Sequence, residues 1–363
     1  MFFKKLWQKL RPQNVVIAQQ STPDDNLKIA IQSFWNKVKQ SEQSLSELQP
    51  LDLMEKLNNL LSENQLDVIA EIMGGEVKKH KIIFTAEGKI ERFELVVEIV
   101  KLAPSLDLFE IEAFRQRANK ISDFEINFNG TSFSLGASDL LIQYHEDHRK
   151  IALDLMFAKP IAKDQINYAQ TLALVILDHL LGEYDLAIKV QSINFVDTMP
   201  DSNSITAEEF AKRFDDIWKN DLKHTGIFPI SESEDQLFVF ELASKDDPDD
   251  TTLVQRNETA NALACDINYG YGLNLSIELD CKETLSLVYD IEDAISAAFR
   301  ENKKGIHAQN SLHQATRTML WYVEDKHFAT QIIQNILNQY QDLSVKIDCE
   351  FDPAWMEYLA WVD

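Results

Sequence analysis

A polar linker near the middle of the chain most constrains what the sequence can fold into. Residues 200–204 (Pro-Asp-Ser-Asn-Ser) combine residue types that favour turns, and Thr206 with Glu209 forms a capping box at the start of a predicted helix. The chain has 363 residues, more than one domain usually holds. We therefore predict a basic N-terminal segment with a polar linker, followed by two domains, over residues 1–25, 26–199 and 205–363.

Hydrophobic residues in the N-terminal half recur alternately at helical and at strand spacing. The predicted helices span residues 26–41, 51–61, 90–102 and 163–181. The predicted strands span residues 81–86, 109–115, 140–144, 151–158 and 187–195, with one or two more over 124–135 around a turn at 129–130.

The C-terminal half shows a similar alternation. Its predicted helices span residues 207–219, 253–265, 285–300 and 328–340, and its predicted strands span 236–242, 273–279, 316–323 and 344–350. Without the extra helix this order approaches a split β-α-β, ferredoxin-like plan. We therefore expect an α+β protein of two domains, each a mixed or antiparallel sheet covered by helices, with a ferredoxin-like C-terminal domain.

The charge of the chain limits its partners. It holds 59 acidic and 35 basic residues, a formal charge of −24. Nucleic acids bind proteins through lysine and arginine, so we expect no direct nucleic-acid partner. An acidic surface instead attracts a basic protein, although the same charge can serve solubility alone.

The acidic residues are densest between residues 232 and 250, on both sides of the strand predicted at 236–242. This stretch is a candidate site for a basic partner; the alternatives are two solvated loops or a weak calcium site. The calcium alternative lacks the ligand order of a calcium-binding loop. The candidate partner-binding residues are Glu232, Glu234, Asp235, Asp246, Asp247, Asp249 and Asp250.

No catalytic, cofactor or metal motif stands out. The run from His145 to His148 falls on a predicted hairpin turn, where neighbouring side chains point to opposite faces. His179 lies at a helix end, where the helix dipole favours a cation. The chain has only 10 glycines and no G-x-S-x-G elbow. We expect no cofactor and lean against an enzyme.

Cysteine content and hydropathy suggest a cytoplasmic protein. The chain has three cysteines, none in a C-x-x-C pair, and no apolar run long enough to span a membrane. Residues 1–11 combine four cations with the apolar side chains of Phe2, Phe3, Leu6, Trp7 and Leu10. They form either a weak membrane-surface helix or an end that docks on its own domain.

The end of the chain resembles a known family. Residues 317–325 (Arg-Thr-Met-Leu-Trp-Tyr-Val-Glu-Asp) and 352–358 (Asp-Pro-Ala-Trp-Met-Glu-Tyr), with the helix around 289–293, resemble bacterial domain-of-unknown-function family 695 over roughly residues 205–363. That family has no established activity, so the resemblance implies a fold and a bacterial origin. Its plan and acidity are similar to those of the ribonuclease E regulator B proteins, which implies inhibition through binding.

The residues of these two runs have a structural explanation. On a strand, Arg317 could pair with Glu292 or Asp352, and Trp355 and Trp361 could close the core from a short final helix. The motif residues with an expected structural role are Arg317, Tyr322, Asp352, Pro353, Trp355 and Tyr358.

The sequence therefore favours a cytoplasmic binding or regulatory protein, of the immunity or nuclease-inhibitor type, that acts through an acidic surface. The alternatives are a hydrolase with a site assembled between the two domains and a peripheral membrane-associated protein docked by residues 1–11.

Overall fold

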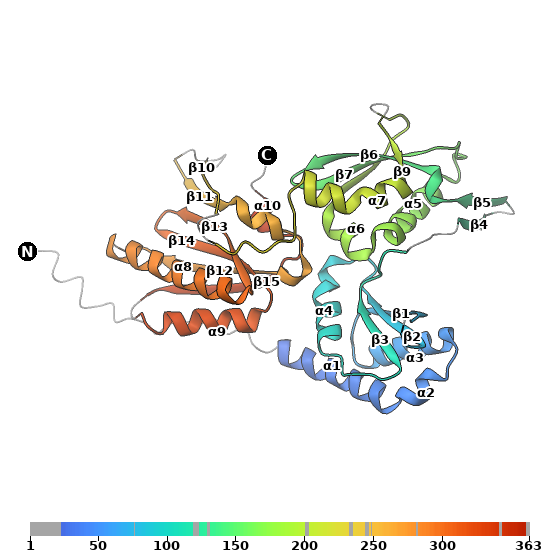
Figure 1. Ribbon diagram of the computed structural model, residues 1–363, viewed down its shortest axis with the longest axis horizontal. Coiled ribbons are helices and arrows are strands. Elements are labelled where there is room, and N and C mark those ends of the chain that lie inside the picture. The colour runs from blue at the N-terminus through green and yellow to red at the C-terminus, as the bar shows by residue number, and fades with distance from the viewer. Residues whose placement is uncertain are drawn as a thin grey trace, which may run out of the picture. The chain divides into compact units, whose positions relative to one another are not determined.

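The structure is a computed structural model that describes most of the chain. The described residues are 23–75, 77–118, 123–128, 131–199, 203–231, 235–243, 247, 249–280, 282–340 and 343–360. Their contacts form two compact units, within Gln20–Leu222 and within Lys223–Asp363, which we call the N-terminal and the C-terminal unit (Figure 1). The features predicted at residues 1–11, 129–130 and 200–202 lie outside the described residues.

The division between the units follows helix α7 (Ala207–Asp216), although we expected this helix to open the C-terminal domain. The predicted capping box is present, with the Glu209 amide donating to the Thr206 hydroxyl at 3.3 Å. However, the ring of Phe210 lies 5.7 Å from that of Tyr144, in the N-terminal unit. The capping signal marks where the helix begins, whereas its apolar face decides which core it joins.

The N-terminal unit contains helices and strands in mixed order. The helices are α1 (Pro23–Gln40), α2 (Glu42–Ser46), α3 (Pro50–Glu63), α4 (Phe93–Lys101), α5 (Ile166–Leu181), α6 (Glu183–Lys189) and α7. The strands are β1 (Ile69–Gly74), β2 (His80–Thr85), β3 (Phe109–Ala113), β4 (Phe124–Phe128), β5 (Thr131–Leu135), β6 (Leu140–Asp147), β7 (Lys150–Phe157), β8 (Val190–Phe195) and β9 (Ile205–Thr206).

These strands form a three-stranded sheet β1-β2-β3, a hairpin β4-β5 and a four-stranded sheet β8-β7-β6-β9. The pairs β2-β3 and β7-β8 are parallel and the others antiparallel. The apolar stripe that predicted α1 faces the core: Ile31, Phe34, Trp35 and Val38 are at most 2 % exposed, and Leu27 is half-buried. The Trp35 ring meets Phe84 of β2 edge-on at 5.5 Å, so α1 covers this sheet.

The N-terminal unit contains four elements that were not predicted, helices α2 and α6 and strands β1 and β9. Residues 187–189 end helix α6, where we expected a strand from 187 onwards, and β8 begins only at Val190. Strand β1 carries no strand signal in the sequence, because Glu71 interrupts its short apolar run. It becomes a strand because β2 provides the hydrogen-bonding partners for its main chain.

The C-terminal unit is built on one large sheet. Its strands are β10 (Leu237–Ala243), β11 (Thr251–Asn257), β12 (Tyr271–Glu278), β13 (Gly305–His313), β14 (Thr316–Val323) and β15 (Val345–Phe351). Its helices are α8 (Lys282–Asn302), α9 (Lys326–Leu337) and α10 (Met356–Leu359), with 3₁₀ turns at Glu258–Leu263 and Ile267–Tyr269.

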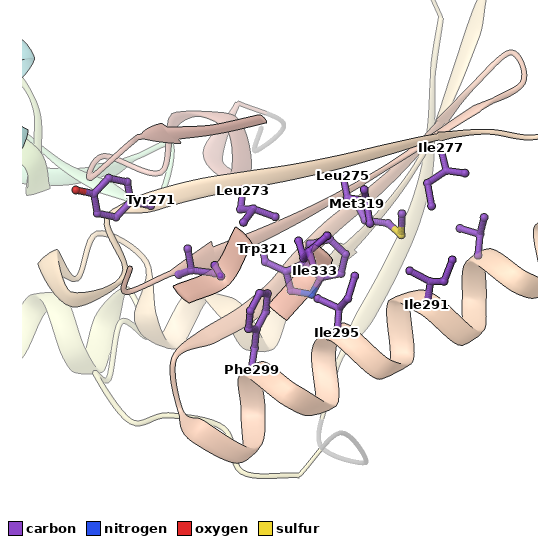
Figure 2. Close-up of a cluster of buried hydrophobic side chains, with 13 residues drawn as sticks. Tyr271, Leu273, Leu275, Ile277, Ile291, Ile295, Phe299, Met319, Trp321 and Ile333 are labelled. Carbon is purple, nitrogen blue, oxygen red and sulfur yellow. The ribbon is translucent and has the colours of Figure 1, made fainter. Parts of the chain in front are cut away.

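The six strands run in the order β10-β11-β13-β14-β12-β15, and every neighbouring pair is antiparallel. Helices α8 and α9 cover one face of this sheet (Figure 2). Leu275 of β12, Trp321 of β14 and Ile295 of α8 are fully buried in the shared core. The four predicted strands of this half are present, in an α+β fold.

Two segments of the C-terminal unit correct the prediction. Residues 253–265, predicted as a helix, form strand β11 and a 3₁₀ turn. Strand β13 was not predicted at all, and it carries His307 and His313. Its polar residues do not suggest a buried strand, yet Gln309 and Asn310 are buried, and the Asn310 amide donates to Gln255 of the neighbouring strand β11. None of the described helices is long and apolar enough to cross a membrane.

Candidate functional site

The predicted acidic stretch surrounds strand β10, which is an edge of the six-stranded sheet. The structure separates its carboxylates into different environments. Asp235 is engaged, because Arg300 of α8 donates to it at 2.7 Å. Asp247 and Asp249 are exposed after the strand, and Asp250 lies 3.6 Å from the His313 ring nitrogen. Glu232, Glu234 and Asp246 lie outside the described residues.

The strand between the acids carries a feature that our sequence analysis missed. Leu237, Phe238 and Val239 are three consecutive apolar side chains that are 50 %, 58 % and 60 % exposed. Glu241 of the same strand is exposed as well. Successive side chains of a strand point to opposite faces, so β10 presents apolar groups on both. The unbroken apolar run in Leu-Phe-Val-Phe was the available signal, since a packed edge strand would alternate.

A buried polar cluster links α8 to the sheet. Arg317 donates to Glu292 at 2.7 Å, which selects one of the two partners we predicted. Asn310 donates to the same carboxylate at 2.6 Å and to Gln255 at 3.1 Å. Its carbonyl oxygen lies 2.9 Å from Nε2 of His307, so that nitrogen carries the proton. These contacts fix the helix on strands β11, β13 and β14.

The remaining motif residues close the C-terminal end. The Tyr322 hydroxyl donates to Asp352 at 2.6 Å, and its ring stacks on Trp355 with 3.7 Å between centroids. Burial raises the pKa of Tyr322 well above its ordinary value, and the Asp352 charge adds to this. Pro353 is buried beside them, and the Tyr358 hydroxyl donates to the carbonyl of Asn257 at 3.0 Å. Trp361 lies outside the described residues.

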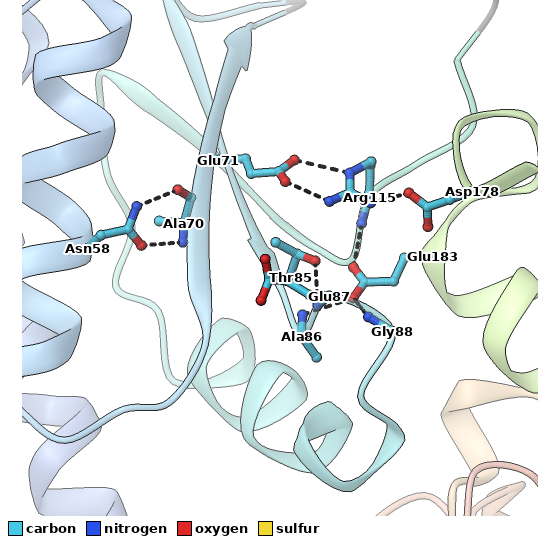
Figure 3. Close-up of polar contacts among 10 residues, drawn as sticks. All are labelled: Asn58, Ala70, Glu71, Thr85, Ala86, Glu87, Gly88, Arg115, Asp178 and Glu183. Atoms are coloured by element: carbon cyan, nitrogen blue, oxygen red, sulfur yellow. Dashed lines mark hydrogen bonds and ion pairs between the residues drawn. The ribbon is translucent and has the colours of Figure 1, made fainter. Parts of the chain in front are cut away.

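A charged cluster joins distant segments of the N-terminal unit (Figure 3). Arg115 donates to both carboxylate oxygens of Glu71, at 3.2 and 2.6 Å, and also to Asp178. Hydrogen bonding to Glu71 raises the pKa of Arg115, and burial raises the pKa of Asp178 although Arg115 opposes it. Arg115 thus forms ion pairs with both carboxylates, and these ion pairs connect β1, the segment after β3 and the end of α5.

The histidine runs singled out in the sequence do not converge on a site. His148 lies at the turn between β6 and β7 with a φ of 50°, and its Nδ1 lies 2.6 Å from Asp147. The His179 ring, near the end of α5, packs 5.8 Å from Phe124. No group of three or more metal-ligating side chains comes together within the described ranges.

A cleft of about 420 Å³ lies beside strand β3 and residues 103–106. Its charged walls are engaged: Lys81 lies 3.1 Å from Glu112, and Glu110 accepts from the amides of Val77 and Lys78 at 2.7 Å. The cleft arises between a loop and an edge strand, so no local motif could have indicated it.

The chain matches no known protein family, no curated protein and no solved structure.

Proposed function

We propose that this chain is a binding or regulatory protein that engages a basic protein through the acidic surface at the β10 edge. One observation carries the proposal: Glu241, Asp247 and Asp249 are exposed, and none of them forms an ion pair with another described residue. Exposed carboxylates that no cation neutralises project a negative field into solvent, which attracts cations and repels phosphate backbones. An immunity protein or a nuclease inhibitor is the form of regulator that this chemistry suits best.

We further propose that the two units are independent domains and that the C-terminal one is ferredoxin-like. The order β12-α8-β13-β14-α9-β15 supports this, because its strands lie side by side as β13-β14-β12-β15. Strands β10 and β11 would then be an addition at the β13 edge. Membership of family 695, on the strength of the motif residues, belongs to the same proposal.

The proposal is tested by affinity capture from a lysate of the native host at low and at high salt. The double variant Asp247→Asn with Asp249→Asn removes two exposed charges beside β10. A matched control, Asp290→Asn with Asp293→Asn, removes two exposed charges on α8.

We expect the wild type and the control to retain a basic protein that high salt releases, because salt screens exposed charges. We expect the double variant at residues 247 and 249 to retain less of it. A wild type that captures no salt-sensitive basic protein, or equal loss in both double variants, contradicts the proposal.

A further inference from the structure

We infer that the free edge of β10 binds the basic partner as an added β-strand, which is a segment with apolar side chains at its centre and lysine or arginine at both ends. This inference rests on the proposed function and specifies how the partner is held. Addition of a strand to an exposed sheet edge gives affinity through main-chain hydrogen bonds and specificity through side chains.

The first support is the set of backbone groups that face outwards. The Glu258 amide donates to the Gln236 carbonyl at 2.8 Å, and this pair continues the antiparallel register of β10 with β11. Hydrogen-bonded and non-hydrogen-bonded pairs alternate along such a ladder, so Phe238 and Phe240 point their amides and carbonyls towards β11. Leu237, Val239 and Glu241 therefore point theirs away from the sheet, and no other described strand pairs with them.

The second support is the side chains along this edge. Leu237 and Val239 lie on the face that α8 covers farther along the sheet, and Phe238 lies on the other face. Leu253, opposite Glu241 on β11, adds a further apolar group that is 46 % exposed. An added strand with alternating apolar residues would cover groups on both faces, which water now contacts.

Two other sheet edges, at β15 and at β1, show how this protein protects an edge strand. At β15, the polar Lys346, Asp348 and Glu350 alternate with apolar residues that pack on the core. At β1, Asn58 of α3 hydrogen-bonds to both the amide and the carbonyl of Ala70 and so occupies the edge (Figure 3). Along β10 a single charge, Glu241, interrupts the apolar run, so this edge is left open to pairing.

Charge decides which strand fits. Acidic residues precede β10 at 232, 234 and 235 and follow it at 246, 247, 249 and 250. A second copy of this chain would bring its own exposed carboxylates, Glu241, Asp247 and Asp249, to this edge, where like charges repel. A segment with cations at both ends meets Asp247 and Asp249 with one of its ends in either orientation, whereas Asp235, before the strand, already accepts from Arg300.

The test uses a defined probe, the peptide Lys-Lys-Thr-Val-Thr-Val-Thr-Lys-Lys with blocked termini, and the full chain. Binding is measured by fluorescence anisotropy, and amide hydrogen exchange locates the site. The variant Val239→Pro removes one outward amide while keeping every charge, and an edge strand tolerates proline there. Val239→Thr keeps the amide and serves as the matched control.

We expect the peptide to protect residues 237–243 from exchange. Binding to Val239→Pro should be about tenfold weaker, the effect of one lost hydrogen bond, and binding to Val239→Thr should stay within about threefold. The variant with Asp247→Asn and Asp249→Asn should bind more weakly with a shallower salt dependence. A peptide with glutamate in place of lysine should not bind.

A second measurement uses the wild-type protein and changes only the peptide, so it tests the inference even if Val239→Pro fails to fold. N-methyl groups are placed on alternate peptide amides, in two sets that block opposite edges of the peptide strand. We expect only one set to abolish binding. Equal effects of the two sets, protection outside 237–243, or a wild-type dimer that Val239→Pro dissociates would each overturn the inference.

The two proposals fail differently. A wild type that captures no salt-sensitive basic protein contradicts the proposed function. A captured basic protein that binds Val239→Pro as tightly as the wild type, but not the variant at residues 247 and 249, contradicts only the strand pairing.

Discussion

Glu183 and Arg115 are joined by two reciprocal hydrogen bonds, one between their main chains and one from the Arg115 main chain to the Glu183 side chain. The Glu183 amide donates to the Arg115 carbonyl at 2.8 Å, and the Arg115 amide donates to the Glu183 carboxylate at 3.2 Å. The same carboxylate accepts from the amides of Ala86 and Gly88 at 2.9 and 3.0 Å (Figure 3). One buried side chain therefore joins the end of β2, the segment after β3 and the start of α6.

Replacing Glu183 should destabilise the N-terminal unit. Glu183→Ala leaves three amides without their acceptor, and we expect a loss of about 3 kcal/mol or more in the free energy of unfolding. Glu183→Gln keeps one acceptor oxygen and should cost less. Urea unfolding followed by circular dichroism measures this, with the exposed Glu55→Ala as control. A Glu183→Ala variant as stable as that control would contradict the role of the carboxylate.

Gly182, between α5 and α6, should not accept a side chain. Its φ is +82°, and a Cβ there would lie 3.1 Å from the Arg115 carbonyl oxygen. Gly88 has a similar φ of +74° but no heavy atom within 4 Å. We expect Gly88→Ala to cost about 1–2 kcal/mol from the backbone alone, and Gly182→Ala to cost more. Thermal unfolding of the two variants should rank them in that order; the reverse order would rule out crowding at Gly182.

The two hydrogen bonds from the Asn58 side chain to the main chain of Ala70 should stabilise the N-terminal unit. Its side chain accepts from the Ala70 amide at 2.8 Å and donates to the Ala70 carbonyl at 2.9 Å, and Ala70 is fully buried. Asn58→Ala should cost about 2–3 kcal/mol, because two buried backbone groups lose their partner. The neighbouring Asn59 is exposed, so Asn59→Ala is a matched control that should be nearly neutral. Similar urea midpoints for the two variants would refute this.

His80 should make the N-terminal unit sensitive to mild acid. Burial lowers the pKa of His80, with Lys79 contributing. Below the ordinary histidine pKa of about 6.5, this histidine is protonated in the unfolded chain but not yet in the folded chain. The free energy of unfolding should therefore fall as the pH drops below about 6.5. His80→Leu should weaken this dependence between pH 7 and 5, and replacement of the exposed His145 by Gln should not. Equal pH profiles for the wild type and His80→Leu would contradict it.

Tyr322 should make the C-terminal unit less stable at high pH. Because its folded pKa is raised, the unfolded chain loses the phenol proton first, and stability should fall as the pH rises above about 10. Tyr322→Phe loses the hydrogen bond to Asp352 and about 1.5–3 kcal/mol at neutral pH, but should show a shallower decline above pH 10. Urea unfolding between pH 8 and 11 compares the slopes. A variant with the wild-type slope would show that this phenol does not titrate as expected.

The sequence by itself determined the elements whose apolar residues follow a clear period. Helices α1, α3, α5, α8 and α9 and strands β2, β12 and β14 lie where the spacing predicts them, because burial of one face requires that spacing wherever the element packs. The acidity around β10 is likewise a property of the sequence. The pairing of Arg317 with Glu292 was one of two alternatives that the sequence left open.

Only the tertiary structure decided the rest. Strands β1 and β13 carry polar residues whose partners come from distant segments, so their own patterns do not indicate a strand. The Thr206–Glu209 capping box fixes the start of α7, but packing of Phe210 against Tyr144 assigns that helix to the N-terminal unit. Likewise, an apolar strand becomes a candidate binding edge only when no neighbour pairs with it. Strand order depends on contacts remote in the sequence, and local periodicity cannot encode which edge stays open.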